Sequence, residues 1–495
     1  MNKLLKKYNI DIYKNHWYLT SVIIFCGIVL RIIMFVYNKS FWFDEALIGS
    51  SIINKSYLEL FGTLDFIQVA PPLFCVASKF LLNISNVVGN FACQDFVLRM
   101  IPFTFSVLSL PLFAAVAQKF FKNNIFTWIA TSIYCFNHIN LQFCQDCKQY
   151  SLESFIALIM FWIFYSLDLK NSSAKKIFLL SLVFAIAPWF SLSSLFLLLS
   201  MAVTTLIFDI KDKKSLKNFF IFSVPVLTSV CIFVCCYLYP LYLTTFDAQV
   251  HSFSLFDSFY KLDFSIFNFI YRFITDFFSI SINKYIFAVF TILNLFLLFK
   301  QQNKRMVFGI ISSILVVFLA NIPKFYPVAH RLYLFISPLI IFIYLQVLLL
   351  IKNNKILSNL ILTAFIIFVF IYSHNPVQNL LKINNSRNVA EIIKFDNPQM
   401  KNIYYNNPSL NLYAQNNNNK FFFHYEMLDT KAFEQDLEKY SPNEKIYFYT
   451  LFFNNEHNGM LKNYLLSNKK IEVDKYYCQP DFYKFYVSYI VVHKK

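Results

Sequence analysis

Two adjacent acids follow an aromatic cluster shortly after the first long apolar run of the chain. The cluster is Phe41, Trp42 and Phe43, and the acids are Asp44 and Glu45. One interpretation is structural, because acids favour the N-terminal end of a helix and aromatic side chains anchor helices at a membrane surface. The other is catalytic, because a carboxylate at this boundary can act as a general base toward a hydroxyl group. The spacing alone leaves both interpretations open.

A second polar segment, Gln145-Asp146-Cys147-Lys148-Gln149-Tyr150, directly precedes another apolar run. In a structural interpretation Asp146 and Lys148 are an exposed ion pair, which contributes little to stability. In a functional interpretation they face the same cavity as Asp44, where the lysine neutralises a phosphate as a point charge. Cys144 and Cys147 form a single CxxC, which is a weak indication of a zinc site without a second pair or a nearby histidine.

Two arginines stand at the start of other apolar runs. Arg331 follows Tyr326-Pro327, and Arg99 lies where the apolar run 98–118 begins. A long cationic side chain at this position either reaches to lipid headgroups or binds a lipid-linked phosphate with its planar guanidinium. A third arginine, Arg31, lies inside the first apolar run, where a charge is costly and indicates a partner or a cavity.

The composition indicates a membrane protein. Hydrophobic residues make up 57% of the 495 positions and charged residues 14%, whereas soluble proteins carry about 25% charged residues. Apolar runs recur from residue 17 to residue 373, and many approach the ~20 residues that a bilayer-spanning helix needs. The net charge is +17, but loop lysines of a membrane protein explain it, so no nucleic-acid partner is required. Six glycines leave no Gly-rich phosphate loop.

We expect eleven transmembrane helices, with the N-terminus cytoplasmic and the C-terminus outside the cell membrane. The expected spans are 17–37, 98–118, 124–143, 150–168, 176–190, 192–209, 218–239, 285–299, 306–321, 331–350 and 356–373. This topology places the lysine-rich loops on the cytoplasmic side only if the run 70–88 does not cross. Pro71, Pro72 and Lys79 also suit a helix that lies in the interface. The first span is expected to be an uncleaved signal anchor.

The chain divides into a transmembrane module, residues 1–374, and an extracytoplasmic α/β domain, residues 375–495. Segments rich in Ile, Tyr and Phe predict strands at 401–405, 420–425, 445–453, 470–477 and 482–492. Helices are expected between them at 387–395, 429–440 and 457–467. A structural or acceptor-docking role is expected for this domain, because it contains no pairing of a nucleophile with a base.

The motifs together resemble a known family of membrane enzymes. They are Trp42-Phe43-Asp44-Glu45-Ala46, Ala70-Pro71-Pro72-Leu73, Leu98-Arg99-Met100-Ile101-Pro102, Gln145-Asp146-Cys147-Lys148-Gln149-Tyr150-Ser151, and Tyr326-Pro327 with Arg331. In this order they resemble GT-C membrane glycosyltransferases of the dolichyl-phosphate-mannose protein mannosyltransferase-like type, including their bacterial relatives. The resemblance covers the first 170 residues well and residues 320–350 loosely.

The resemblance implies a GT-C-like fold with interfacial helices in the first outer loop, and a sugar donor carried on a polyprenyl phosphate. It implies that Asp44 is the catalytic acid of the first loop, with Glu45 beside it, and that Asp146 is the acid of the second loop. The family often has Glu there, followed two residues later by Arg, where this chain has Asp146 and Lys148. Donor phosphate binding is expected from Lys148 and Arg331, with Tyr150 and Arg99.

The expected reaction is a single inverting displacement at the outer face, from a polyprenyl-phosphate sugar to a glycan, lipid or protein acceptor, with Asp44 as the base. The acids can hold a divalent cation, but no ligand set is visible and no metal ligands are assigned. Two other classes of membrane protein remain as alternatives to a glycosyltransferase. A polytopic transporter predicts inverted repeats and mid-membrane charges, and a non-enzymatic component of envelope polysaccharide assembly predicts the spans but not the acids.

Overall fold

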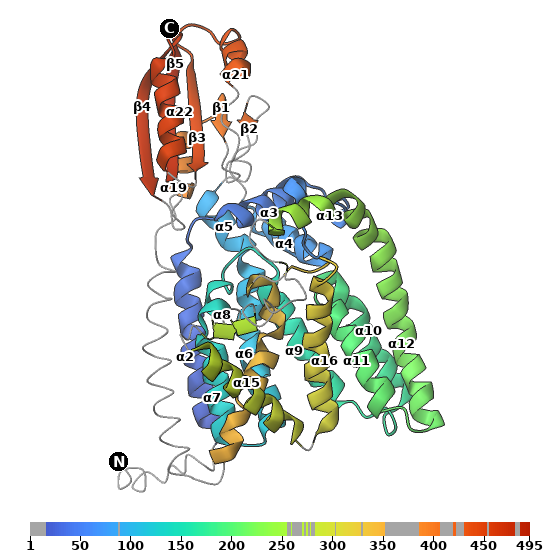
Figure 1. Ribbon diagram of the computed structural model, residues 1–495. Coiled ribbons are helices and arrows are strands. Elements are labelled where there is room, and N and C mark those ends of the chain that lie inside the picture. Colours follow the sequence, from blue (N-terminus) through green and yellow to red (C-terminus); the bar gives the residue numbers. More distant parts are fainter. Residues whose placement is uncertain are drawn as a thin grey trace, which may run out of the picture.

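The structure of the 495-residue chain is a computed structural model. It describes residues 16–87, 90–254, 283–301, 303–327, 330–351, 386–405, 419–421, 430–452, 455–480 and 486–495, together with residues 259, 270, 271, 274, 275 and 278. A large helical bundle carries a small sheet domain at one end (Figure 1).

The bundle is built from helices that coincide with the first ten expected spans. They are α2 (His16–Tyr37), α6 (Met100–Phe121), α7 (Asn124–Phe136) with α8 (His138–Gln142), α9 (Tyr150–Ser166), α10 (Ala174–Phe190), α11 (Ser194–Phe208), α12 (Lys213–Phe233), α15 (Lys284–Phe299), α16 (Lys304–Asn321), and α17 (Ser337–Tyr344) between the 3₁₀ turns η4 (His330–Ile336) and η5 (Gln346–Ile351). The eleventh expected span, 356–373, lies outside the described residues. The polytopic helical fold class is thereby confirmed.

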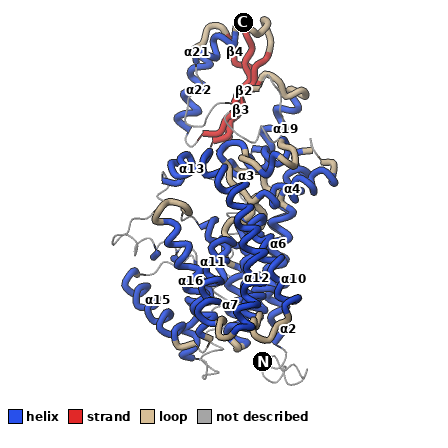
Figure 2. Tube along the Cα trace, turned by 90° about the vertical axis from the view of Figure 1, so that its right-hand side faces the viewer, coloured by secondary structure: helices blue, strands red, loops and turns tan. Residues whose placement is uncertain are grey.

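Hydropathy and exposure indicate that this bundle crosses a bilayer. Among the described helices, four stretches are long and apolar enough to span one: Trp17–Tyr37, Phe91–Phe121, Lys213–His251 and Lys304–Asn321. Large apolar side chains such as Phe25, Val224 and Val289 are exposed on the outside of the bundle, as expected where lipid replaces water. Figure 2 shows the helices running side by side along the long axis of the molecule.

Arg31, a charge expected inside the first span, has partners within the bundle. Arg31 of α2 is buried, and its guanidinium donates to the Ser106 hydroxyl at 2.8 Å and to the carbonyls of Cys135 and Gly27 at 2.8 and 3.1 Å. The contacts with Ser106 and Cys135 tie α2 to α6 and α7. Arg31 is thus a packing residue of the bundle, because its hydrogen bonds compensate for the cost of burial.

The first long loop forms short helices at the end of the bundle nearest the sheet domain (Figure 1). These are α3 (Phe43–Asn54), η1 (Glu59–Phe61), η2 (Asp65–Ile67), α4 (Pro72–Ser85) and α5 (Phe91–Leu98). The 14-residue helix α4 packs against α3, η1 and α5 of the same loop. Pro72 occupies its first turn, where a proline costs no hydrogen bond. The helix of the predicted run 70–88 thus packs against the first loop, and its exclusion from the membrane stays a prediction.

The helix that begins at Lys213 is longer than the predicted span 218–239. It continues through a π-helical segment, η3 (Val234–Leu238), into α13 (Tyr239–Ser254), which bends over the first loop in Figure 1. The hydroxyl of Tyr237 donates to the carbonyl of Ala70, and the Gln249 amide donates to the carbonyl of Ile67. Tertiary contacts with the first loop thus extend the helix beyond the apolar run.

The lysine-rich loops meet at the opposite end of the bundle. Lys119, near the end of α6, donates to Ser166 at the end of α9 at 2.6 Å. Arg305, at the start of α16, pairs with Asp209 after α11 at 2.7 Å. Lys170, after α9, pairs with Asp212 before α12 at 3.4 Å. The helix ends that carry these basic residues thus lie together at one end of the bundle. The predicted order of spans, which alternate in direction across the membrane, places them at the same end.

The C-terminal region contains a five-stranded mixed sheet in the order β2-β1-β3-β5-β4. Its strands are β1 (Ile403–Tyr405), β2 (Lys420–Phe421), β3 (Lys445–Phe452), β4 (Ile471–Pro480) and β5 (Tyr486–Lys494), and its helices are α19 (Ser386–Asp396), α21 (Thr430–Leu437) and α22 (Asn455–Ser467). β1 pairs in parallel with β2 and β3, whereas β5 is antiparallel to β3 and β4. Each predicted strand and helix of this domain overlaps one in the structure, whereas residues 422–425 and 482–485 of two predicted strands lie outside the described residues. Its boundary at residue 374 lies outside the described residues and stays a prediction.

Candidate active site

The sequence-predicted site residues form one connected network at the end of the bundle that carries the first loop. They are Asp44 and Glu45 in the first turn of α3, Arg99 between α5 and α6, Asp146 and Lys148 in the loop before α9, Tyr150 at the start of α9, and Arg331 in η4. Four separate parts of the chain contribute to it. The packing of the first loop on α6 and α9 brings these parts together.

The first turn of α3 directs its two acids, Asp44 and Glu45, to different sides of the helix. The Trp42 backbone N–H donates to the Glu45 carboxylate at 3.3 Å, which is the reciprocal part of a capping box. Both acids also lie where the helix dipole favours negative charge. Neighbouring residues on a helix point about 100° apart, and so Glu45 faces the interior of the protein whereas Asp44 faces another side.

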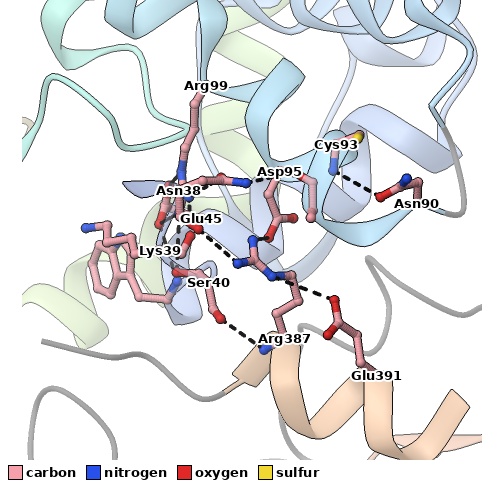
Figure 3. A network of polar contacts seen from close by, with 12 residues as sticks. Asn38, Lys39, Ser40, Glu45, Asn90, Cys93, Asp95, Arg99, Arg387 and Glu391 are labelled. Atoms are coloured by element: carbon pink, nitrogen blue, oxygen red, sulfur yellow. Dashed lines mark hydrogen bonds and ion pairs between the residues drawn. The ribbon is translucent and has the colours of Figure 1, made fainter. Parts of the chain in front are cut away.

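Glu45 is fully buried in a forked ion pair with Arg99 (Figure 3). The Arg99 Nε and Nη2 atoms donate to the two carboxylate oxygens at 2.9 and 2.8 Å. The Cys147 backbone N–H donates to the same carboxylate at 2.6 Å. Glu45 thereby links the first loop to the loop that carries Asp146 and Lys148, and its carboxylate serves to position those loops.

The guanidinium of Arg99 is engaged by protein groups on each of its nitrogen atoms. Besides Glu45, it contacts the Asn38 side chain at 3.4 Å, the Lys39 carbonyl, and the Ser40 carbonyl at 3.3 Å. It is 1% exposed and lies over the ring of Phe41. This geometry does not support the phosphate-binding role expected for Arg99 from the sequence, because a phosphate would have to displace these partners. We reassign Arg99 as a positioning residue.

Asp44 lies between two cations. Its carboxylate forms an ion pair with Arg331, whose guanidinium is 5.6 Å from the centre of the Trp42 ring. The carboxylate is 20% exposed and the guanidinium 27%, so the pair borders open space. Burial opposes the ionised form of Asp44, but the charges of Arg331 and Lys148 outweigh burial and hold its pKa below the usual value. Asp44 is thus a carboxylate with a cationic partner, Arg331.

Lys148 supplies the second cation of this group. Its ammonium donates to the Gln68 side chain at 2.9 Å, and the residue is 4% exposed. Burial lowers the pKa of Lys148, while the nearby carboxylate of Asp44 raises it. A lysine with one neutral hydrogen-bond partner and a low-dielectric surrounding is suited to gain a negatively charged ligand.

Asp146 has a partner that sequence reasoning missed. Lys39 approaches its Oδ1 atom to 2.8 Å, and both side chains are largely buried. Burial opposes the charge of Lys39, but the carboxylates of Asp146 and Glu45 outweigh it and raise the pKa of the lysine. Burial raises the pKa of Asp146 in spite of Lys39. A signal was present, since Lys39 follows a span at its predicted outer end, where the positive-inside rule disfavours a lysine.

Tyr150 completes the network from α9. The residue is 4% exposed, and its ring packs edge-on against Phe143 with centroids 5.4 Å apart. It lies close enough to Arg331 and Asp44 for electrostatic interaction. This placement brings Tyr150 beside the two groups that border open space.

The CxxC pair contributes no reactive group. Cys144 and Cys147 are free and buried, and burial raises the pKa of the Cys144 thiol to about 12. Such a thiol stays protonated at neutral pH and is inert as a nucleophile. Within the described parts of the chain, no group of three or more His, Cys, Asp or Glu residues is arranged to hold a metal ion.

Comparison with solved structures identifies the fold. The chain matches the crystal structure of ArnT from Cupriavidus metallidurans in the apo state with a TM-score of 0.56 and 9% identity, over 95% of this chain and 97% of that one. It matches the same protein bound to undecaprenyl phosphate with a TM-score of 0.56 and 8% identity, over 96% and 98% of the two chains. No family model and no curated protein matches the sequence. The GT-C fold expected from the motifs is confirmed.

Proposed function

We propose that this protein transfers a sugar from a polyprenyl-phosphate donor to an acceptor hydroxyl at the outer face of a cell membrane. The observation that carries the proposal is the arrangement of Asp44 between Arg331 and Lys148 at an exposed edge of the network. A base with two adjacent cations suits a reaction that removes a proton and releases a phosphate. The ArnT structure with undecaprenyl phosphate, on the same fold, supports a lipid-phosphate donor by analogy.

In the proposed reaction the acceptor oxygen attacks the anomeric carbon of the sugar. The bond from that carbon to the phosphate oxygen breaks, and polyprenyl phosphate leaves with the electron pair. Asp44 takes the proton of the acceptor hydroxyl. A single displacement from the face opposite the phosphate inverts the anomeric configuration. The substrate class of the sugar, hexose or pentose, is not specified by these residues.

Arg331 and Lys148 bind the donor phosphate in this proposal. The departing phosphate gains negative charge as the glycosidic bond breaks, and cations already in place stabilise that charge more in a shielded site than in water. Arg331 is paired with Asp44 before the donor arrives. A phosphate that attracts the guanidinium away from Asp44 frees the carboxylate, and its pKa then rises toward a value at which it is a better base.

The remaining residues of the network have supporting roles. Glu45 and Arg99 fix the loops, and the Lys39–Asp146 pair lies beside them. Asp146 orients its neighbours or contacts the acceptor, and Tyr150 lines the donor side. The first loop and the sheet domain occupy the extracytoplasmic side of the inner membrane, opposite the basic helix ends, with the N-terminus cytoplasmic.

Two observations favour transfer over transport or a purely structural role. Arg31, a charge within the first span, is engaged by protein groups of the bundle. The charges of the site gather at one end of the bundle, where a lipid headgroup can reach them, and not at its midplane as transporters require. A non-enzymatic assembly protein has no need of an acid held between two cations.

The test uses the full chain in proteoliposomes with radiolabelled polyprenyl-phosphate sugars and an extract of envelope glycans as acceptor. The expected result is label on the acceptor together with free polyprenyl phosphate, and no transfer by Asp44→Asn. Movement of the label across the bilayer without transfer would identify a transporter, and neither activity would leave the assembly role. Mass analysis of envelope glycans from cells with and without the protein identifies the sugar and the acceptor.

A further inference from the structure

We propose that Arg387, at the base of the sheet domain, is a positioning residue for the active site. It acts through the segment 38–40, which carries Lys39. This inference rests on the proposed function and assigns a role to the C-terminal domain in the same reaction. Arg387 lies in the first turn of α19, 347 positions from its partner Ser40 in the chain. Figure 3 shows it inserted between α5 and the segment 38–40.

Arg387 reaches three groups of the first loop. Its Nη1 atom donates to the buried carboxylate of Asp95 in α5 at 3.2 Å, and its Nη2 atom donates to the Asn38 carbonyl at 3.0 Å. Its backbone N–H donates to the Ser40 hydroxyl at 3.2 Å. The guanidinium is 16% exposed and Asp95 is 0% exposed. This shielding makes the contact stronger than a surface ion pair.

The segment 38–40 is held from its other side by Arg99, which contacts the Asn38 side chain and the carbonyls of Lys39 and Ser40. The two arginines thus hold three consecutive residues between them, one from the membrane module and one from the sheet domain. The Asn38 side chain also donates to the Ala92 carbonyl of α5 at 2.8 Å. These contacts all restrict the same short stretch of backbone.

The conformation needs such support. Asn38 has a φ of 46°, in the left-handed region that non-glycine residues rarely adopt. Asparagine tolerates this region better than most residues, but the turn still has to be held. It directs the chain from the end of α2 into Lys39, which pairs with Asp146, and on to the first turn of α3 with Asp44. A shift at Asn38 would therefore displace Lys39, the partner of Asp146, and also Asp44.

Other residues of α19 dock the helix without contacting this segment. Ala390 is buried in a cluster with Phe41 and Phe91, and the Lys394 ammonium lies 4.5 Å from the centre of the Phe91 ring. Removal of the Arg387 side chain leaves these contacts and the backbone bond to Ser40 in place. The domain is thus expected to stay attached when the positioning contact is lost, and the two effects can be separated.

The test compares Arg387→Ala with Lys394→Ala, its matched control on the same helix, in the full chain in proteoliposomes. For Arg387→Ala we expect kcat for sugar transfer to fall between about 10- and 100-fold, as a misplaced catalytic group does, with the KM for the donor unchanged. Lys394→Ala should retain the wild-type kcat. A kcat for Arg387→Ala equal to that of wild type would overturn the proposal, as would equal losses in the two variants.

Hydrogen exchange provides a second measurement that does not depend on activity. Arg387→Ala should speed the exchange of backbone amides in residues 38–45 but not in β3 of the sheet. Faster exchange in both regions would mean that the domain has come loose, and unchanged exchange in residues 38–45 would mean that Arg387 does not hold the segment; either contradicts the proposal. If the wild type transfers no sugar, the proposed function fails, while the exchange result still decides whether Arg387 holds the segment.

Discussion

The carboxylate of Asp44 and the guanidinium of Arg331 lie 287 positions apart in the chain and form an ion pair at an exposed edge of the candidate active site. The pair joins the first loop to η4 (His330–Ile336). It also holds the pKa of Asp44 below the usual value in spite of burial. The base of the proposed reaction is thus paired at rest with a residue that we assign to the donor phosphate, so donor binding and base activation are coupled.

Asp44→Asn should abolish sugar transfer and leave donor binding largely intact. The amide keeps the size of the side chain but cannot accept the proton, and a general base contributes about 100- to 10,000-fold to the rate. Single-turnover transfer and equilibrium binding of the labelled donor, each in proteoliposomes, measure the two properties. Asp65→Asn is the matched control, since Asp65 is an acid of the same loop that pairs with Lys55. Near-normal transfer by Asp44→Asn would refute the assignment of the base.

Arg331→Ala should weaken donor use and shift the acid limb of the pH profile. Loss of one charge-assisted contact to phosphate raises the donor KM by about 10- to 100-fold. Arg331 favours the ionised form of Asp44, so its removal raises the pKa of Asp44. The value of kcat/KM, which reports the free enzyme, should therefore fall at a higher pH than in wild type as the solution is acidified.

The control for that experiment is Lys324→Ala, which removes an exposed cation from the segment before Arg331. It should change neither the donor KM nor the pH profile. If Arg331→Ala raises the KM for the acceptor and leaves dependence on the donor unchanged, Arg331 contacts the acceptor and the assignment to phosphate is wrong.

Most of the fold could be predicted because a bilayer imposes it. Apolar runs long enough to cross must be helices, and the distribution of lysines predicts that the run at 70–88 stays out of the membrane. The continuation of α12 (Lys213–Phe233) into α13 (Tyr239–Ser254) could not be predicted in this way. Polar residues such as Asp247 interrupt the apolar run there, and the helix persists because it packs on the first loop through Tyr237.

The sequence was enough to locate the candidate site. It was not enough to predict which of its residues has which role. Asp44 and Glu45 are neighbours with similar chemistry, and only the direction of each side chain from α3 (Phe43–Asn54) decides that one meets Arg99 inside and the other meets Arg331 at the edge. Lys39 was missed because its partner, Asp146, follows more than 100 residues later. Pairings between such distant residues depend on how the loops pack.

Glu45→Ala should mainly lower the folding stability of the protein, because Glu45 positions the loops and does not take part in the reaction. It leaves Arg99 buried without a carboxylate, and breaking a buried ion pair in this way costs about 3–5 kcal/mol. The expected result is a clear fall in the thermal unfolding temperature of the purified protein. Glu59→Ala, which removes an exposed acid of the same loop, should have a much smaller effect. An unchanged unfolding temperature for Glu45→Ala would contradict the positioning role.

Lys39→Met should make the kcat of sugar transfer fall at neutral pH and recover in part at higher pH, unlike that of the wild type. Lys39 lowers the pKa of Asp146, which burial and the Glu45 carboxylate already raise, so removing the lysine raises that pKa further and shifts Asp146 toward its protonated form. If ionised Asp146 is needed, the variant loses kcat at neutral pH and regains part of it as the pH rises. Lys55→Met, which removes the partner of a more exposed acid in the same loop, should leave the profile unchanged. A profile for Lys39→Met that matches the wild type would mean that the charge of Asp146 is not required for transfer.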